Sequence, residues 1–234
     1  MTLDSRQNDS PVMQREISLI FGKTGMGKSN YIKTYLDSLK RVIILDPLDE
    51  YPADEFNDIE TLIEYLESIG KDEPFRVKSC NILDLEPLGE IVDVMPNVTF
   101  IIEEAQRCLP MSRQELPDSL QRIIFLGRHY GRSLVIAAQR PSIVHIAARS
   151  QWTRIVTFNI TETGDVKWLK EQSGYSLDDD PDIRKLPIGE YFEITPGSFE
   201  VKHAPLFKPK RKEVESKSGI EKFFDDFQSL TFQT

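Results

Sequence analysis

The sequence has few of the residues that build disulfide scaffolds and zinc sites. Its 234 residues include 2 cysteines, Cys80 and Cys108, and 3 histidines that lie far apart along the chain. Disulfide frameworks and Cys/His zinc sites need more of these residues at short, regular spacings. The sequence therefore disfavours both classes, and we expect a reducing cytoplasm as the compartment.

Long apolar runs and net positive charge are also missing. No apolar run approaches the ~20 residues that cross a bilayer, and residues 1–14 are polar without an apolar core. We therefore expect neither a membrane span nor a signal peptide, and we interpret 1–14 as a mobile arm. The net charge is −9, so contact with a nucleic acid would depend on a local basic patch.

The most informative feature that is present is a glycine-rich segment at 22–29. It reads Gly-Lys-Thr-Gly-Met-Gly-Lys-Ser, follows the apolar run 17–21 and precedes a helical pattern at 30–39. This is the P-loop (Walker A) pattern G-x-x-x-x-G-K-[ST], whose backbone N–H groups cradle a polyphosphate. A flexible Gly-Lys linker is the alternative, which the strand before and the helix after disfavour. The sequence therefore predicts binding of a nucleoside triphosphate.

The P-loop also predicts the cofactors, ATP and Mg²⁺. In such loops the lysine, here Lys28, reaches the β- and γ-phosphates, and the hydroxyl of Ser29 is offered to Mg²⁺. The helix that begins here adds the positive end of its dipole. The expected nucleotide-binding residues are Gly22, Lys23, Thr24, Gly25, Met26, Gly27, Lys28 and Ser29.

Apolar, β-rich runs alternate with helical patterns along the chain, which is typical of βαβ units. The runs 42–45, 98–102 and 134–138 are apolar on both faces, as buried parallel strands are. We predict an α/β fold, with a mostly parallel central sheet and helices on both faces. The predicted strands are 16–21, 41–46, 75–79, 97–102, 133–138 and 153–158, with a hairpin near 189–194 and 198–203. The predicted helices are 29–39, 59–69, 116–129 and 163–173.

Polar side chains follow two of the central strands. In such sheets ligands bind at the carboxyl ends of the strands, where Glu103, Glu104 and Gln139 fall in this sequence. We assign Glu103 to the Mg²⁺ shell and Glu104 to the attacking water, which it orients or deprotonates. The amide of Gln139 would sense the γ-phosphate or that water. Solvated acids at a strand end and a turn glutamine are the alternatives.

Several segments together carry a family resemblance. They are 103–107, 127–141, which ends in Gln-Arg-Pro, and 46–51, which reads Asp-Pro-Leu-Asp-Glu-Tyr, with a further likeness over 142–158 and 186–190. The chain resembles the FtsK/HerA superfamily of ring-forming, DNA-pumping ATPases over about residues 15–203, and 46–51 is similar to the HerA branch. Two positions depart from the family pattern, because Glu103 stands where Asp is usual and Ala138 where Thr is common.

The resemblance implies a RecA-like core in a hexameric or pentameric ring, with nucleotide sites between subunits and double-stranded DNA in the channel. An arginine of one subunit would then complete its neighbour's site. Arg128 matches that residue in the family, and Arg149 and Arg154 are the alternatives. The sequence shows little beyond the ATPase core, and in this it is most similar to the genome-packaging ATPases of internal-membrane viruses. That similarity implies a location in the host cytoplasm or at a packaging vertex of the virion. A plasmid or host DNA-processing motor, a small P-loop kinase and a nucleotide-dependent assembly scaffold remain alternatives.

The composition changes after Pro205. Residues 208–212 are basic, 213–219 read as a linker, and 220–230 show an apolar stripe at helical spacing. This helix would pack on the core or a neighbouring subunit, or dock onto a capsid or membrane protein. We therefore divide the chain into 1–14, an ATPase domain at 15–207, and a charged linker with a short amphipathic helix at 208–234. The loop 107–117 is a weaker candidate for contact with DNA phosphates, and a plain surface loop is the alternative.

Overall fold

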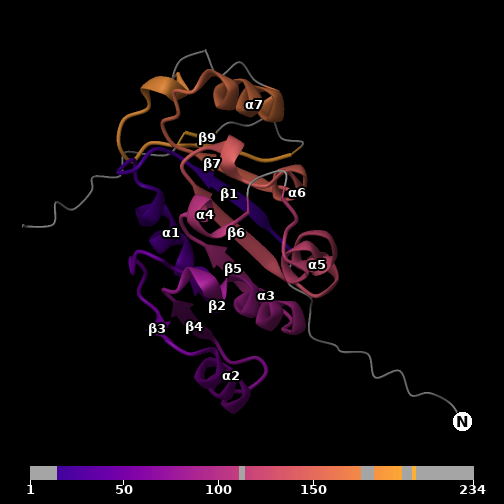
Figure 1. Ribbon diagram of the computed structural model, residues 1–234. Helices are drawn as coiled ribbons and strands as arrows, with labels where there is room; N and C mark the ends of the chain where they lie inside the picture. Colours follow the sequence, from indigo (N-terminus) through magenta and orange to yellow (C-terminus); the bar gives the residue numbers. More distant parts are fainter. Residues whose placement is uncertain (1–14, 111–113, 175–181, 197–201, 204–234) are drawn as a thin grey trace, which may run out of the picture.

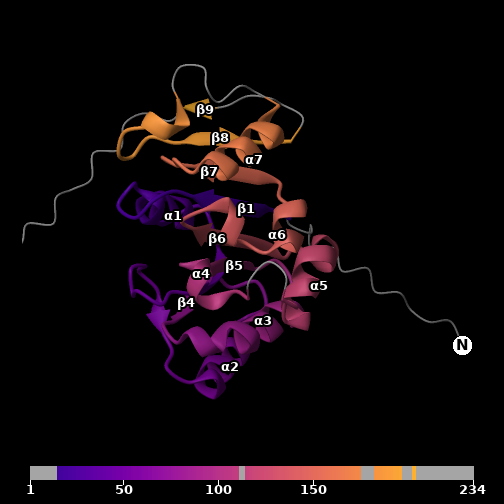
Figure 2. The same ribbon diagram turned by 45° about the horizontal axis from the view of Figure 1, so that its top comes forward.

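The central feature of the computed structural model is a nine-stranded sheet in the order β3-β4-β2-β5-β6-β1-β7-β8-β9. The structure describes residues 15–110, 114–174, 182–196 and 202–203. The strands are β1 (Ile17–Phe21), β2 (Arg41–Leu45), β3 (Asp54–Glu55), β4 (Phe75–Ser79), β5 (Thr99–Ile102), β6 (Ser133–Ala138), β7 (Arg154–Thr157), β8 (Phe192–Ile194) and β9 (Lys202–His203). The strands β8 and β9 lie at one edge of the sheet and β3 and β4 toward the other (Figures 1 and 2).

Among the described strands, neighbours from β3 to β7 in this order pair parallel, whereas β8 pairs antiparallel with both β7 and β9. Their register brings the carboxyl ends of four strands side by side. Leu45 pairs with Ile102 between β2 and β5, and Phe21 pairs with Ala138 between β1 and β6. The predicted α/β fold with a mostly parallel sheet is therefore confirmed.

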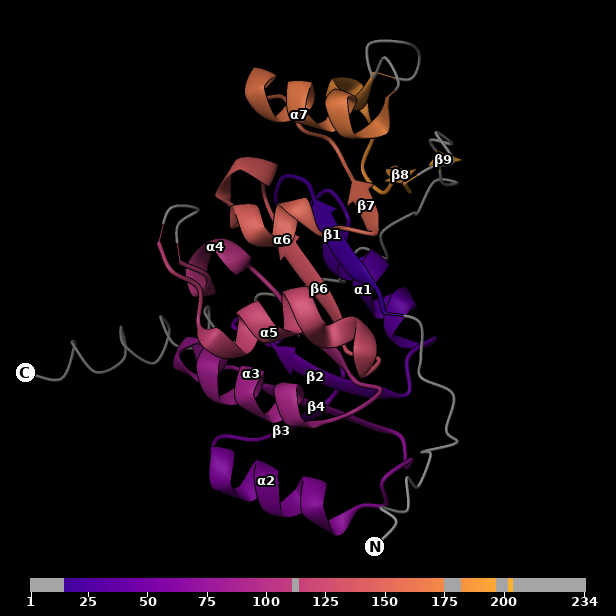
Figure 3. The same cartoon turned by 90° about the vertical axis from the view of Figure 1, so that its right-hand side faces the viewer.

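Helices cover both faces of this sheet. They are α1 (Lys28–Leu36), α2 (Ile59–Ser68), α3 (Leu85–Val94), α4 (Ala105–Cys108), α5 (Asp118–Leu126), α6 (Ile146–Ser150) and α7 (Thr163–Ser173). On one face, Ile32 and Leu36 of α1 pack against residues such as Ile44 and Val135. The other strand residues face α2, α3, α5, α6 and α7. Figure 3 shows α1 on the opposite side of the sheet from α3, α5 and α6. Alternate strand residues thus serve two apolar cores.

Helix α3 has no counterpart among the predicted helices, because it contains Pro87 and Gly89. Pro87 lies in the first turn, where its missing N–H leaves no helical hydrogen bond unmade. Gly89 lets α5 approach closely, since a Cβ there would lie 2.6 Å from Oγ of Ser119. Proline and glycine, which usually indicate a turn, are therefore both accommodated within this helix. Similarly, the predicted helix 116–129 is shorter, because the chain leaves α5 at Leu126 and makes a 3₁₀ turn, η2 (Gly127–His129).

Some predictions fall outside the described residues. These are the arm at 1–14, the basic run and helix within 208–234, and the middle of the loop 107–117. In the part of the chain that the structure describes, none of the helices combines the length and apolar character needed to cross a membrane.

Candidate nucleotide site

The P-loop connects β1 to α1, and close contacts with Phe158 require glycine at two of its positions. Gly22 has φ 154°, and a Cβ there would lie 2.6 Å from Cβ of Phe158. Gly27 has φ 116°, and its Cβ would lie 3.1 Å from the Phe158 ring. Phe158 directly follows β7, the strand next to β1. The loop is therefore pressed against the neighbouring strand end, which fixes its backbone.

Positive charge is concentrated at the start of α1. The Lys28 side chain is buried, and its Nζ donates to the carbonyl oxygen of Gly22 at 2.9 Å. The first turn of α1 holds no acidic residue, so nothing in that turn offsets the positive end of the helix dipole. A helix N-terminus with a lysine beside it is a site suited to phosphate.

Two acidic residues follow the neighbouring strands β2 and β5. Asp46 and Glu103 are 0% and 1% exposed, and the Glu103 N–H donates to the carbonyl oxygen of Leu45 at 3.0 Å. The Tyr51 hydroxyl donates to Oε2 of Glu103 at 2.6 Å. Burial raises the pKa of Glu103 to about 7, against the opposing effects of the Tyr51 hydrogen bond and the Lys28 charge. Glu103 is therefore a carboxylate held in a fixed position inside the fold.

Glu104 adopts a left-handed backbone conformation, with φ 48° and ψ 48°, just before α4. Residues with a Cβ avoid this region, at a cost of roughly 1 kcal/mol. The turn allows consecutive residues to line the same cleft, which a continuing strand would prevent, because successive strand side chains point to opposite faces. Glu103 and Glu104 thus face one space.

That space is a cleft of about 530 Å³ between the P-loop, the strand end at 103–104 and the loop 46–51. It is lined by Lys28 and Ser29 as well as Glu103 and Glu104, so residues 75 positions apart in sequence meet there. Thr24, Gly25 and Gly27 also line it, whereas Gly22, Lys23 and Met26 belong to the loop without lining the cleft. Cationic and acidic predicted residues therefore share one cavity.

The oxygen donors of this cleft fit Mg²⁺. The Ser29 hydroxyl and the Glu103 carboxylate are hard oxygen ligands, which Mg²⁺ prefers. The hydroxyl of Tyr51 donates to the Glu103 carboxylate. Ser29 and Glu103 line the same cleft, so both predicted ligands face the space where the cation would bind.

Gln139 follows β6 and is half-buried. Since Phe21 pairs with Ala138, Gln139 lies beside the start of the P-loop, at the carboxyl ends of the strands as predicted. Among the described residues, however, it does not line the cleft. Its position is next to the site rather than in it.

The three candidate arginines differ in exposure and contacts. Arg128 lies on η2, which precedes β6 at the amino ends of the strands, and it is exposed. Arg149 donates to the carbonyl oxygen of Val144 and lies over the Trp168 ring. Arg154 donates to Oγ of Ser18 and pairs with Glu16. Of the three, Arg128 is the one turned toward solvent, at the end of the sheet away from its own cleft.

The sequence prediction gave no role to several residues that shape the site. Tyr51 lies in a segment quoted for the family resemblance, but only the fold brings it to Glu103. Ile188 lines the cleft, and the neighbouring Gly189 N–H donates to the Met26 carbonyl oxygen at 2.9 Å. Lys78 and Phe158 carried no sequence signal, because they act through contacts between strands distant in sequence.

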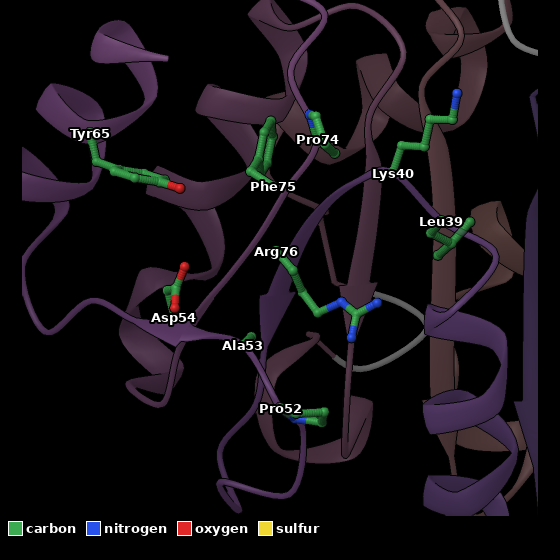
Figure 4. A pocket seen from close by; sticks show the side chains of 9 residues that line it. All are labelled: Leu39, Lys40, Pro52, Ala53, Asp54, Tyr65, Pro74, Phe75 and Arg76. Atoms are coloured by element: carbon green, nitrogen blue, oxygen red, sulfur yellow. The ribbon is translucent and has the colours of Figure 1, made fainter. Parts of the chain in front are cut away.

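A second cleft of about 530 Å³ lies beside α2 and the β3–β4 edge (Figure 4). The Arg76 guanidinium donates to the carbonyl oxygen of Leu36 at 2.8 Å, so it is engaged within the protein. Figure 4 shows Lys40 and Arg76 pointing in different directions, so the two cations do not converge on one ligand position. The P-loop cleft is therefore the candidate functional site.

Comparison with known proteins agrees with this choice. The family model described as "Helicase HerA, central domain" matches residues 13–104, which contain the P-loop and both acids. Among curated proteins, none matches the chain.

Solved structures share the fold. The genome packaging NTPase B204 from Sulfolobus turreted icosahedral virus 2, in complex with sulfate, is 17% identical, with 83% of this chain and 98% of that chain covered and a TM-score of 0.66. The same NTPase in complex with AMPPCP is also 17% identical, with 82% of this chain and 98% of that chain covered and a TM-score of 0.65. The cytoplasmic domain of the Thermomonospora curvata Type VII secretion ATPase EccC is 13% identical, with 82% of this chain and 24% of that chain covered and a TM-score of 0.53.

The fold and the cleft define the class of this protein as a P-loop NTPase. Within that class, residues 13–104 match the model of the HerA central domain, and the fold is similar to that of a viral genome packaging NTPase. The predicted resemblance to the FtsK/HerA superfamily is confirmed.

Proposed function

We propose that the protein is a ring-forming, Mg²⁺-dependent ATPase that moves double-stranded DNA, with viral genome packaging as its task. The observation that carries the proposal is the single cleft in which Lys28 and Ser29 meet Glu103 and Glu104. The fold similarity to a packaging NTPase solved with AMPPCP supports both the nucleotide and the task.

The residues of the cleft suit hydrolysis of the γ-phosphate. Lys28 and the N-terminus of α1 bind the phosphates, and Ser29 with Glu103 would hold Mg²⁺, which neutralises phosphate charge when bound. Glu104 accepts a proton from the water as the water oxygen bonds to phosphorus and the bond to the ADP oxygen breaks. Gln139 lies beside the P-loop and outside the cleft, so its action on this water or on the γ-phosphate stays a prediction.

Two different faces of the chain support assembly into a ring. Around Arg128, the apolar residues Phe125, Leu126 and Tyr130 are 46%, 50% and 50% exposed. The cleft rim offers the apolar residues Leu48 and Ile188, together with the acidic groups of the loop 46–51. A contact between unlike faces of one chain generates a closed ring when its rotation closes. In such a ring, Arg128 serves the cleft of the adjacent subunit.

The proposal is tested with Glu104→Gln, which keeps the shape of the side chain and removes the base. The variant should bind ATP normally and release phosphate at least about 100-fold more slowly, the low end for a general base. Glu64→Gln, which removes an exposed carboxylate of α2 outside the cleft, is the control and should turn over within about twofold of wild type. Near-normal turnover of Glu104→Gln would remove Glu104 from the mechanism.

The same preparation separates the classes of function. Phosphate release is measured with and without double-stranded DNA, and the number of subunits is determined by analytical ultracentrifugation. A ring stimulated by DNA supports the motor. Phosphoryl transfer to a small acceptor would instead indicate a kinase, and assembly without turnover would indicate a scaffold.

The finer assignments are a capsid or membrane docking partner for 220–230 and a location at a packaging vertex. They stay predictions, because 220–230 lies outside the described residues. A plasmid or host DNA-processing motor of the HerA type would give the same results in the assays above.

A further inference from the structure

Both backbone polar groups of Tyr51, at the end of the loop 46–51, are hydrogen-bonded to side chains. The Tyr51 N–H donates to Oδ2 of Asp46 at 2.9 Å, and the Tyr51 carbonyl oxygen accepts from Nζ of Lys78 at 2.9 Å. Lys78 comes from β4, is 6% exposed, and also pairs with Asp46 and Asp49. The buried Lys78 of β4 therefore fixes a loop that begins at the end of β2, the neighbouring strand of the sheet.

The side chain of Tyr51 extends from this anchor to the nucleotide cleft. Its ring is 2% exposed and packs in the core on the α1 side of the sheet. Its hydroxyl donates to Oε2 of Glu103 at 2.6 Å. A buried tyrosine hydroxyl needs a partner, and a main-chain carbonyl would suffice. Here the partner is one of the two predicted Mg²⁺ ligands, and the other, Ser29, lines the same cleft.

We propose that Tyr51 is a positioning residue for the predicted Mg²⁺ ligand Glu103, and that Lys78 and Asp46 act through it. The inference rests on the function proposed above and names a device within the same site. The Tyr51 hydroxyl on Oε2 fixes the orientation of the Glu103 carboxylate, which would hold the cation together with Ser29. Partners of this kind, one step removed from a metal, orient its ligands and typically change metal affinity about 10–100-fold when lost.

The charges around the loop give Lys78 its part in this arrangement. Asp46, Asp49 and Glu50 place acidic groups within six consecutive residues, close to the buried Glu103. The Lys78 ammonium lies 4.0 Å from Oδ2 of Asp46 and also contacts Asp49. It therefore offsets repulsion that would otherwise push the loop, and Tyr51 with it, away from Glu103.

The test measures affinity for AMPPCP with and without MgCl₂ by titration calorimetry, which needs no hydrolysis. Tyr51→Phe removes only the hydroxyl. Its affinity without Mg²⁺ should stay within about twofold of wild type, while the gain in affinity on adding Mg²⁺ should fall about 10-fold. Tyr35→Phe is the matched control, since it removes a hydroxyl bonded to another glutamate, Glu16, and should change neither value.

Lys78 provides a second, independent variant. Lys78→Met should lose the Mg²⁺-dependent gain in the same way, and Lys78→Arg, which keeps the charge, should restore most of it. If Lys78→Met does not fold, as judged by circular dichroism, Tyr51→Phe alone decides.

Each outcome bears on the inference. Equal losses with and without Mg²⁺ in Tyr51→Phe would show a purely structural role and overturn it, as would an unchanged gain. Absence of any Mg²⁺ gain in wild type would overturn it together with the Mg²⁺ requirement of the proposed function. A reduced gain in Tyr51→Phe, with wild-type protein that shows no DNA-stimulated turnover, would support Tyr51 and reject the motor.

Discussion

The nucleotide cleft and the face around Arg128 hold their charged groups in opposite ways. In the cleft, Lys28 and Glu103 are almost fully buried and each has a hydrogen-bond partner within the chain. At the other end of the sheet, Arg128 is exposed and donates to its exposed neighbour His129, and Phe125, Leu126 and Tyr130, close to it in sequence, are exposed as well. A group that works within its own chain can be fixed by folding, whereas a group meant for a second molecule must stay accessible. The contrast is what the proposed site, completed by an arginine of a second subunit, would require.

The largest expected effect comes from breaking the exposed part. Arg128→Ala should leave ATP binding within about twofold but slow turnover of the assembled protein about 1,000-fold, as loss of a trans-acting arginine does. Steady-state phosphate release and nucleotide titration check the two values. Arg122→Ala is the control, because it removes another arginine of this region that is paired with Asp93, and it should turn over normally.

Mixing variants sharpens the same prediction. Arg128→Ala keeps an intact cleft, and Glu104→Gln keeps an intact arginine, so a mixed ring contains complete sites between unlike subunits. Activity should therefore reappear when the two inactive proteins are mixed and reassembled. Mixtures as inactive as their components would argue that Arg128 does not act across a subunit boundary.

The next effect tests how rigidly the cleft is built. Gly22→Ala would place a methyl group 2.6 Å from Cβ of Phe158, at φ 154°. We expect it to lower the free energy of unfolding by about 2–4 kcal/mol, from the clash and the backbone strain together. Gly25→Ala has no neighbour within 4 Å, so only its φ of 79° opposes it, and the loss should be about 1 kcal/mol. Urea unfolding of both variants decides, and equal losses would contradict the contact with Phe158.

The smallest expected effect is a pH dependence of stability. Glu103 has a pKa of about 7 in the folded protein, raised mainly by burial from the ordinary value of 4.5. The folded state therefore binds more protons than the unfolded state between these values, and this contribution to stability declines as pH rises from about 4.5 to 7.

Glu103→Gln removes the loss of stability that comes from burying an ionised carboxylate. Without nucleotide and Mg²⁺, it should unfold at a free energy about 1–3 kcal/mol higher than wild type at pH 8, with the difference vanishing near pH 4.5. Urea unfolding at both pH values measures this. Parallel pH profiles of the two proteins would contradict the burial of a titrating Glu103.

Local patterns predicted most of the fold. The strands 75–79 and 133–138 match β4 and β6 residue for residue, because an alternation of apolar and polar residues in the first and a short apolar run in the second both favour a strand. Helix α3 was beyond such reasoning, since Pro87 and Gly89 are tolerated only through their place in the helix and the approach of α5. The strand order of the sheet also depends on contacts between distant segments.

The candidate site could be predicted in its chemistry but not in its supports. The pattern at 22–29 and the acids after β5 are visible because their chemistry requires these residue types next to strand ends. Tyr51 and Lys78 are not visible in this way, since a tyrosine and a lysine acquire a role only when β2, β4 and β5 lie side by side. For Gln139, the sequence predicted the position after β6 correctly, but it could not predict that the residue lies outside the cleft.

The left-handed turn at Glu104 has a consequence for protein engineering. Glycine adopts φ 48° without penalty, so the chain carries a carboxylate at a backbone position that favours a residue with no side chain. Asp49, on the cleft rim, has a similar φ of 52°. Selection for heat resistance alone would therefore tend to erase the cleft's own acids, and thermostable versions of this protein should be sought by altering positions elsewhere in the chain.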